Sequence, residues 1–269
     1  MTVESSNRMT ETHKGAQRRE IPTNGPPEGG RGTDDGPAAP AAGLTPTRVL
    51  VALGAIGSVL FLAVAALLGL LQPGYDAIRQ PMSELVLGSL GWAQTASFYA
   101  TGLSFVAFAL GFALDFFRRL SPRLWVAKSL IGLAGVLIAI SGAGLLISGA
   151  FPTDPSGAPQ TEAGAIHDLA FLLVLPPLIL AYPAAALAMR KVPGWSRHAL
   201  VTAFVPVVVF GLMFVFVGFA GDPGDPLYAV GGLVQRALLA VAFGWITLTG
   251  WRLLRRPAAG DQHAGSSVR

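Results

Sequence analysis

The segment Phe151–Asp168 carries the densest group of chemically active side chains in the sequence. His167 and Asp168 are adjacent there, and Asp154 lies near the start of the same segment. A neutral imidazole can accept a proton around neutral pH, and a carboxylate bonded to its other ring nitrogen would orient it. These residues are therefore the candidate catalytic groups, with His167 as a general base, Asp168 or Asp154 as its orienting acid, and water or Ser83 as the nucleophile.

The same residues also fit a structural role. If a helix begins at about residue 168, its dipole stabilises Asp168 as an anion and disfavours a protonated His167. Asp154 and Asp168 are of a type that caps helix ends, and an interfacial His167 can bond to a loop carbonyl. The sequence leaves both interpretations open.

A second polar group consists of Ser83 and Glu84 in one loop and Gln235 and Arg236 at the start of the last apolar segment. An arginine facing hydrocarbon costs about 2.5–3.5 kcal/mol on insertion scales, so Arg236 needs a partner or a wet cavity. An ion pair with an acidic loop residue, an anion site for a lipid phosphate or carboxylate, and a side chain that reaches the headgroups are all consistent with its position. We take the four residues as candidate ligand-binding groups.

Six apolar runs must position these groups. Each is close to the roughly 20 residues that span a hydrocarbon core as a helix. Helices are expected because a lipid-exposed backbone has to satisfy its own hydrogen bonds, and the alternating pattern of a barrel is absent. The prediction is an all-α, polytopic transmembrane bundle over residues 45–256. Its spans are expected at about 48–71, 94–116, 126–148, 168–189, 199–220 and 230–252.

Charge distribution predicts the orientation of the bundle. Basic residues precede the first run, follow the sixth, and occupy every second loop, whereas acidic residues dominate the remaining loops. Since Lys and Arg in short loops stay in the cytoplasm, both termini are expected inside, in the cytoplasmic membrane of the cell. Residues 1–44 and 257–269 contain no long apolar run and are expected to be disordered tails.

Composition excludes several classes. The 269 residues are 52% hydrophobic and 13% charged, with a mean hydropathy of +0.56, against about 25% charged residues in soluble domains. The net charge of +4 does not indicate nucleic-acid binding, because the basic residues lie at span ends and form no stripe. There is no cysteine, and one outer histidine gives little basis for a metal site. We expect no metal, no cofactor and no nucleic-acid partner; the bilayer is the expected surrounding, and the oligomeric state is left open.

Several short motifs resemble a known family. They are Ser83-Glu84-Leu85, Leu90-Gly91-Trp92, Phe151-Pro152-Thr153-Asp154, Gly164-x-x-His167 and Gly232-Leu233-Val234-Gln235-Arg236. With them, residues 45–255 or so resemble the bacterial and archaeal multi-pass membrane proteins of the domain of unknown function 998 family. The resemblance implies a bundle of six or seven spans whose characteristic polar residues gather on one face. It implies no reaction.

Three functions are consistent with the sequence. The first is a membrane protein that binds a lipid headgroup or a small anion in an outward-facing polar pocket. The second is a membrane-embedded lipid hydrolase or transferase that uses His167 as general base. The third is a small-solute transporter, favoured by Pro176, Pro177 and Pro183 in the fourth span and disfavoured by the scarcity of ionisable groups in mid-membrane.

Overall fold

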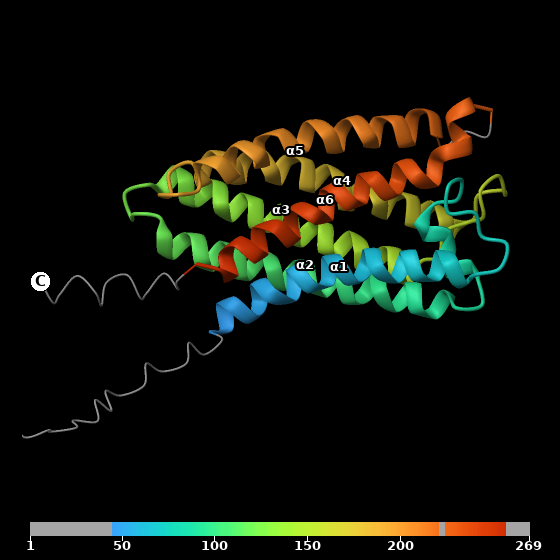
Figure 1. Cartoon of the computed structure of the whole chain (residues 1–269), viewed down its shortest axis with the longest axis horizontal. Coiled ribbons are helices and arrows are strands. Elements are labelled where there is room, and N and C mark those ends of the chain that lie inside the picture. The colour runs from blue at the N-terminus through green and yellow to red at the C-terminus, as the bar shows by residue number, and fades with distance from the viewer. Residues whose placement is uncertain (1–44, 221–223, 257–269) are drawn as a thin grey trace, which may run out of the picture. The chain divides into compact units, whose positions relative to one another are not determined.

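A computed structural model describes residues 45–220 and 224–256 of the chain (Figure 1). The two expected tails and Asp222 lie outside the described residues. The described part is helical and contains no strand. Its elements are α1 (Pro46–Leu71), η1 (Met82–Leu87), α2 (Gly91–Arg119), α3 (Trp125–Ala150), α4 (Glu162–Met189), α5 (Ser196–Val215), η2 (Phe216–Ala220), η3 (Pro226–Val230) and α6 (Gly231–Leu254).

Six helices in the described residues are long and apolar enough to cross a membrane. The prediction of an all-α bundle with about six spans is therefore confirmed, and the chain is a multi-pass membrane protein. Local signals set the helix starts: Thr45 caps α1 through its hydroxyl and Pro46 occupies the first turn, while Thr161 caps α4. The three prolines leave α4 unbroken from Glu162 to Met189.

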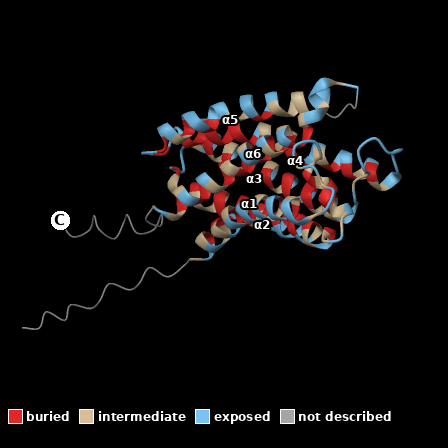
Figure 2. Ribbon diagram, turned by 45° about the vertical axis from the view of Figure 1, so that its right-hand side comes forward, coloured by how far each residue is buried: buried red, intermediate tan, exposed pale blue. Residues whose placement is uncertain are grey.

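The helices pack in chain order, each against the next, and α6 returns to α1 to close the ring. Large aromatic side chains fill the centre, and burial is concentrated on the inward faces (Figure 2). Phe105 and Phe61 both meet Phe243 in edge-to-face contacts, with ring centroids 4.9 and 5.4 Å apart. Two of the three buried polar aromatics are satisfied, because Tyr182 donates to the Ala242 carbonyl at 3.1 Å and Trp245 to the Thr202 hydroxyl at 2.9 Å. The buried indole N–H of the third, Trp195, has no acceptor in the described residues.

Close approach of α2 and α3 depends on two glycines. A β carbon at Gly102 would lie 2.7 Å from the carbonyl oxygen of Gly142, and one at Gly142 would lie 2.6 Å from that of Gly102. Only residues without a side chain fit this reciprocal contact. Small residues therefore set the helix spacing, as they do in many membrane bundles.

Helix α5 is the least enclosed of the six. In its most apolar stretch 11% of the residues are buried, against 33–50% in the other five. It lies at the edge of the bundle in both views (Figures 1 and 2). At its C-terminus the α-helix gives way to the π-helical turn η2.

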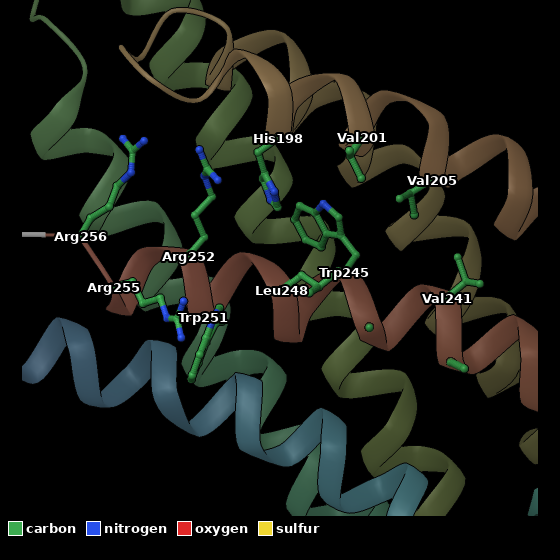
Figure 3. Close-up of a pocket in the computed structure, with 12 residues that line it drawn as sticks. His198, Val201, Val205, Val241, Trp245, Leu248, Trp251, Arg252, Arg255 and Arg256 are labelled. Carbon is green, nitrogen blue, oxygen red and sulfur yellow. The ribbon is translucent and has the colours of Figure 1, made fainter.

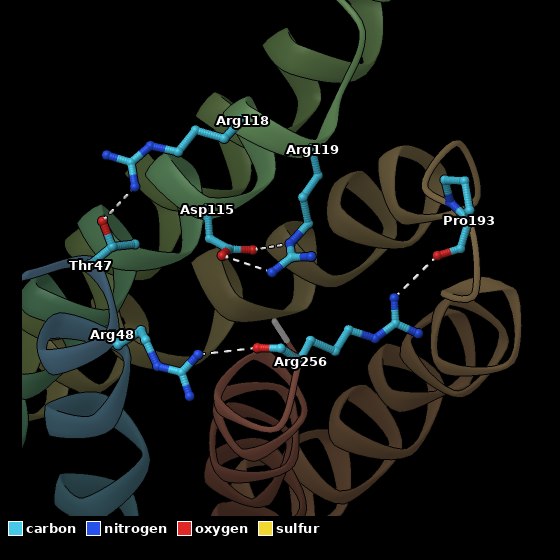
Figure 4. A network of polar contacts seen from close by, with 7 residues as sticks. All are labelled: Thr47, Arg48, Asp115, Arg118, Arg119, Pro193 and Arg256. Atoms are coloured by element: carbon cyan, nitrogen blue, oxygen red, sulfur yellow. Dashed lines mark hydrogen bonds and ion pairs between the residues drawn. The ribbon is translucent and has the colours of Figure 1, made fainter. Parts of the chain in front are cut away.

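The two ends of the bundle differ in charge. One end holds the α2–α3 and α4–α5 loops and both described chain ends. Its basic side chains include Arg48, which donates to the Arg256 carbonyl at 3.1 Å (Figure 4). Arg48 also donates to the Leu254 carbonyl. Its single described carboxylate, Asp115, pairs with Arg119 (Figure 4). We call this the basic end and the opposite end, with the α1–α2 and α3–α4 loops, the acidic end.

Candidate functional site

A cavity of about 660 Å³ opens at the acidic end. Six of the seven residues singled out in the sequence line it, although they come from four separate parts of the chain. These six are Ser83, Glu84, Asp154, His167, Asp168 and Gln235. The remaining wall is largely apolar and includes Leu169, Phe171 and Leu172 of α4 and Phe216 and Val217 of η2. The cavity thus combines polar residues from η1, the α3–α4 loop and the first turns of α4 and α6 with apolar residues of α4 and η2.

Segment η1 supplies Ser83 and Glu84. It is a 3-10 helix, Met82–Leu87, and α2 follows from Gly91. Glu84 is only 4% exposed. One carboxylate oxygen accepts from the Ser156 backbone N–H at 2.9 Å and from the Ser156 hydroxyl, and the other accepts from Gln80 Nε2 at 2.8 Å. Glu84 therefore ties η1 to the α3–α4 loop.

His167 lies in the first turns of α4 and is 6% exposed. Its Nδ1 is 2.8 Å from the Phe151 carbonyl oxygen, and its ring meets the edge of Phe98 at a centroid distance of 5.9 Å. A carbonyl can only accept, so Nδ1 carries the proton and Nε2 of the neutral ring is an acceptor. Within the described part of the chain Nε2 has no hydrogen-bond partner.

The two candidate orienting acids do not contact His167. Asp154 accepts from the Thr161 N–H at 2.7 Å and from the Thr161 hydroxyl at 2.9 Å, and that hydroxyl in turn caps the Gly164 N–H at 3.1 Å. Asp168 is exposed and accepts from Gln160 Nε2 at 3.0 Å. Both carboxylates therefore stabilise the start of α4, and the Phe151 carbonyl replaces them as the group that orients the imidazole.

A second, smaller cavity lies deeper beside His167. Its volume of about 30 Å³ exceeds the roughly 10–15 Å³ that a water molecule requires. Ser83, Ser148, His167 and Gln235 contribute its polar lining. Three of these residues also line the larger cavity, so the two spaces share a polar boundary.

Gln235 and Arg236 hold the α1–α2 loop against α6. The Gln235 side-chain oxygen accepts from the Met82 N–H at 2.6 Å. The Arg236 guanidinium donates to the Gln80 and Gly232 carbonyls at 3.0 Å each and to the Tyr75 hydroxyl at 2.5 Å. Tyr75 donates onward to the carbonyls of Gln80 and Pro81.

The environment of Arg236 differs from the expected ion pair with an acidic loop residue. No carboxylate lies within 4 Å of its guanidinium in the described residues, and it does not line the large cavity. Carbonyl oxygens and the Tyr75 ring, 5.5 Å from the guanidinium carbon, surround it instead. Burial raises the pKa of the Tyr75 phenol more than the hydrogen bond and charge of Arg236 lower it, so this hydroxyl stays protonated at neutral pH.

Sequence reasoning missed Tyr75, Gln80 and Ser156. None of them belongs to a recognisable motif, and Tyr75 and Gln80 act partly through backbone geometry that a sequence does not show. The described residues contain no group of three His, Asp or Glu side chains arranged to hold a metal ion.

Fold and cavity together define a multi-pass α-helical membrane protein with a polar, loop-covered cavity at one end of the bundle. The family described as "Protein of unknown function (DUF998)" matches residues 55–252, so the chain belongs to this family and the resemblance seen in its motifs is confirmed. Comparison with curated proteins and with solved structures gave no match.

Proposed function

We propose that this protein binds the headgroup of a lipid in the cavity at the acidic end. The observation that carries the proposal is the mixed lining, in which the polar residues Glu84, His167 and Asp168 share one cavity with apolar residues such as Leu172 and Val217. An amphiphile presents the same two chemistries. A purely polar solute would leave the apolar wall without a partner.

The lining also selects the type of headgroup. Three carboxylates, Glu84, Asp154 and Asp168, line the cavity, and no lysine or arginine does. A small anion, considered from the sequence on account of Arg236, would meet these carboxylates with no cation to balance them. The chemistry favours a headgroup with hydroxyl or ammonium donors.

Native mass spectrometry tests the proposal. The full-length protein is offered phosphatidylethanolamine and phosphatidylcholine, whose headgroup has no N–H donor, at equal concentration, and wild type is compared with Asp168→Asn and with Glu162→Gln. Both residues are exposed near the start of α4, but only Asp168 lines the cavity. Preferential retention of phosphatidylethanolamine that falls in Asp168→Asn and persists in Glu162→Gln supports the proposal. Equal retention of both lipids in all three proteins contradicts it.

A specific observation favours a second candidate, a membrane-embedded lipid hydrolase or transferase. The hydrogen bond from His167 Nδ1 to the Phe151 carbonyl leaves Nε2 as an acceptor without a partner. Ser83 lines both cavities together with His167, and the smaller cavity is large enough for a water molecule. That is the arrangement a general base requires. Release of a labelled headgroup by wild type but not by His167→Gln would establish it, whereas binding without turnover leaves the binding function alone.

The basic end is proposed to face the cytoplasm, in the cytoplasmic membrane, which places the cavity outside. Because the chain has no cysteine, single cysteines at Ala158 in the α3–α4 loop and Ser121 in the α2–α3 loop report on each side separately. A membrane-impermeant maleimide added to intact cells should label Ala158→Cys and spare Ser121→Cys. The reverse pattern overturns the orientation.

A further inference from the structure

A second large cavity, of about 640 Å³, lies between α5 and α6 toward the basic end (Figure 3). It does not share any lining residue with the cavity at the acidic end. Val201, Val205, Val241 and Leu248 form an apolar section, and Arg252, Arg255 and Arg256 lie at one end (Figure 3). We call it the α5–α6 groove.

The arginines of the groove make few hydrogen bonds in the described structure. Arg256 donates to the carbonyls of Pro193 and Gly194 at 3.1 and 2.7 Å, and Arg252 donates to that of Gly194 at 2.7 Å. Both guanidinium groups also lie over the Trp195 ring, and Arg255 stacks on Trp251 at 4.1 Å. An arginine has five N–H donors, so most of these donors remain unused. The Arg252 Nε–H is buried and has no acceptor.

Positive charge in the groove is not balanced by acidic residues. Asp115, the single described carboxylate at the basic end, is engaged by Arg119. Burial, and then the neighbouring charges of Arg252 and Arg119, lower the pKa of Arg256, as expected where cations are crowded. An anion placed here would relieve this repulsion and accept hydrogen bonds from the unused donors.

We propose that the α5–α6 groove binds one anionic phospholipid, with its phosphate at Arg252 and Arg256 and an acyl chain along Val201, Val205 and Val241. The occupant is a lipid rather than a free phosphate because the apolar section continues from the arginines along α5, the least enclosed helix, whose outer face is exposed. Basic pockets between helices on the side expected to be cytoplasmic suit anionic headgroups. This site is separate from the headgroup site proposed at the acidic end and prefers the opposite charge.

The test is native mass spectrometry of the full-length protein with phosphatidylglycerol and phosphatidylcholine at equal concentration. Wild type should retain one phosphatidylglycerol, and the double variant Arg252→Gln with Arg256→Gln should lose it by roughly tenfold or more in affinity. A matched double variant, Arg190→Gln with Arg197→Gln, removes the same charge from exposed residues of the basic end outside the groove. It should retain the lipid.

Arg252 and Arg256 also donate hydrogen bonds to the α4–α5 loop. A further variant therefore separates loss of the binding site from loss of the fold. Val205→Trp fills the apolar section without altering any charge or hydrogen bond, and it should also displace phosphatidylglycerol. Equal loss of phosphatidylglycerol from the Arg252/Arg256 and the Arg190/Arg197 double variants would show diffuse attraction of the lipid to the basic end and overturn the proposal. Undiminished binding in Val205→Trp, or equal retention of the two lipids by wild type, would overturn it as well.

Discussion

The side-chain oxygen of Gln235 accepts a hydrogen bond from the backbone N–H of Met82 at 2.6 Å, and both residues are buried. This contact joins the first turn of η1 to the start of α6 and fixes the floor of the acidic-end cavity, which Gln235 also lines. The stability of the cavity therefore depends on a pair of residues 153 positions apart.

Gln235→Ala should destabilise the protein. The substitution leaves the Met82 N–H buried without an acceptor, at a cost of about 1–3 kcal/mol. Thermal unfolding in detergent measures the effect. Gln160→Ala is the control: it removes one solvent-exposed hydrogen bond, to Asp168, and leaves no buried group without a partner, so it should unfold near the wild-type temperature. Equal effects of the two substitutions would show that the buried contact contributes no more than an exposed one.

Arg236→Lys should lower stability without reducing lipid retention by the folded protein. A lysine cannot bond to the Gln80 carbonyl, the Gly232 carbonyl and the Tyr75 hydroxyl at once, and hydrogen bonds to charged groups contribute about 1.5–3 kcal/mol each. Because Arg236 does not line the cavity, the ligand should remain. Native mass spectrometry and thermal unfolding of the same sample separate the two effects, with exposed Arg79→Lys as the control. Loss of lipid from an otherwise stable Arg236→Lys would assign it to the binding site.

Tyr75 should make stability depend on pH in the alkaline range. Its pKa is raised in the folded protein, chiefly by burial, so the unfolded chain releases this proton first, from about pH 10. The contribution of the protonated Tyr75 phenol to folding stability is fully present below pH 10. It is lost as the pH rises through the higher pKa that this phenol has in the folded protein.

Unfolding measured on either side of pH 10 should show a steeper fall for wild type than for Tyr75→Phe. Tyr99→Phe, which removes an exposed phenol from α2, should behave like wild type. Parallel curves for wild type and Tyr75→Phe would contradict the assignment.

Glu84→Gln should loosen the α3–α4 loop. The carboxylate accepts three hydrogen bonds from Ser156 and Gln80, and an amide replaces one acceptor oxygen with a donor. Hydrogen exchange at the Ser156 amide should accelerate by roughly tenfold, corresponding to the loss of one charge-assisted bond. Exposed Glu162→Gln should leave this amide unchanged. Exchange at the wild-type rate in Glu84→Gln would mean that another contact holds the loop.

Gly142→Ala should destabilise the packing of α2 on α3. The added methyl group meets the Gly102 carbonyl oxygen at 2.6 Å, and overpacking of this kind costs about 1–3 kcal/mol. Gly211→Ala in α5 is the matched control, because a β carbon there has no neighbour within 4 Å. Because Ala is the better helix former, Gly211→Ala should not lower the unfolding temperature. An unfolding temperature of Gly142→Ala at or above that of wild type would contradict the role of this contact in packing.

The helices were predictable because membrane spans have a simple requirement of length and apolarity, which the six runs meet. The gathering of the polar motifs at one end of the bundle was also predictable, because antiparallel spans bring alternate loops to the same end. Glu84, His167 and Gln235 line one cavity for this reason.

The partners within the site were not predictable. His167 bonds to the Phe151 carbonyl and Arg236 to the Gln80 carbonyl, and backbone acceptors carry no residue-specific signal. Asp168 follows His167 directly, yet residues adjacent along a helix point in different directions, so it turns to Gln160 instead. The α5–α6 groove escaped notice because Val201 and Val205 are equally consistent with a lipid-facing surface.

Helix α5 borders both cavities: its Val201 and Val205 line the groove at one end, and Phe216 and Val217 of the turn that continues it line the acidic-end cavity at the other. As the least enclosed helix of the bundle, it is the one whose sideways displacement breaks the fewest buried contacts. The two compartments share no lining residue, yet one lightly enclosed helix and the turn that continues it lie along both of them.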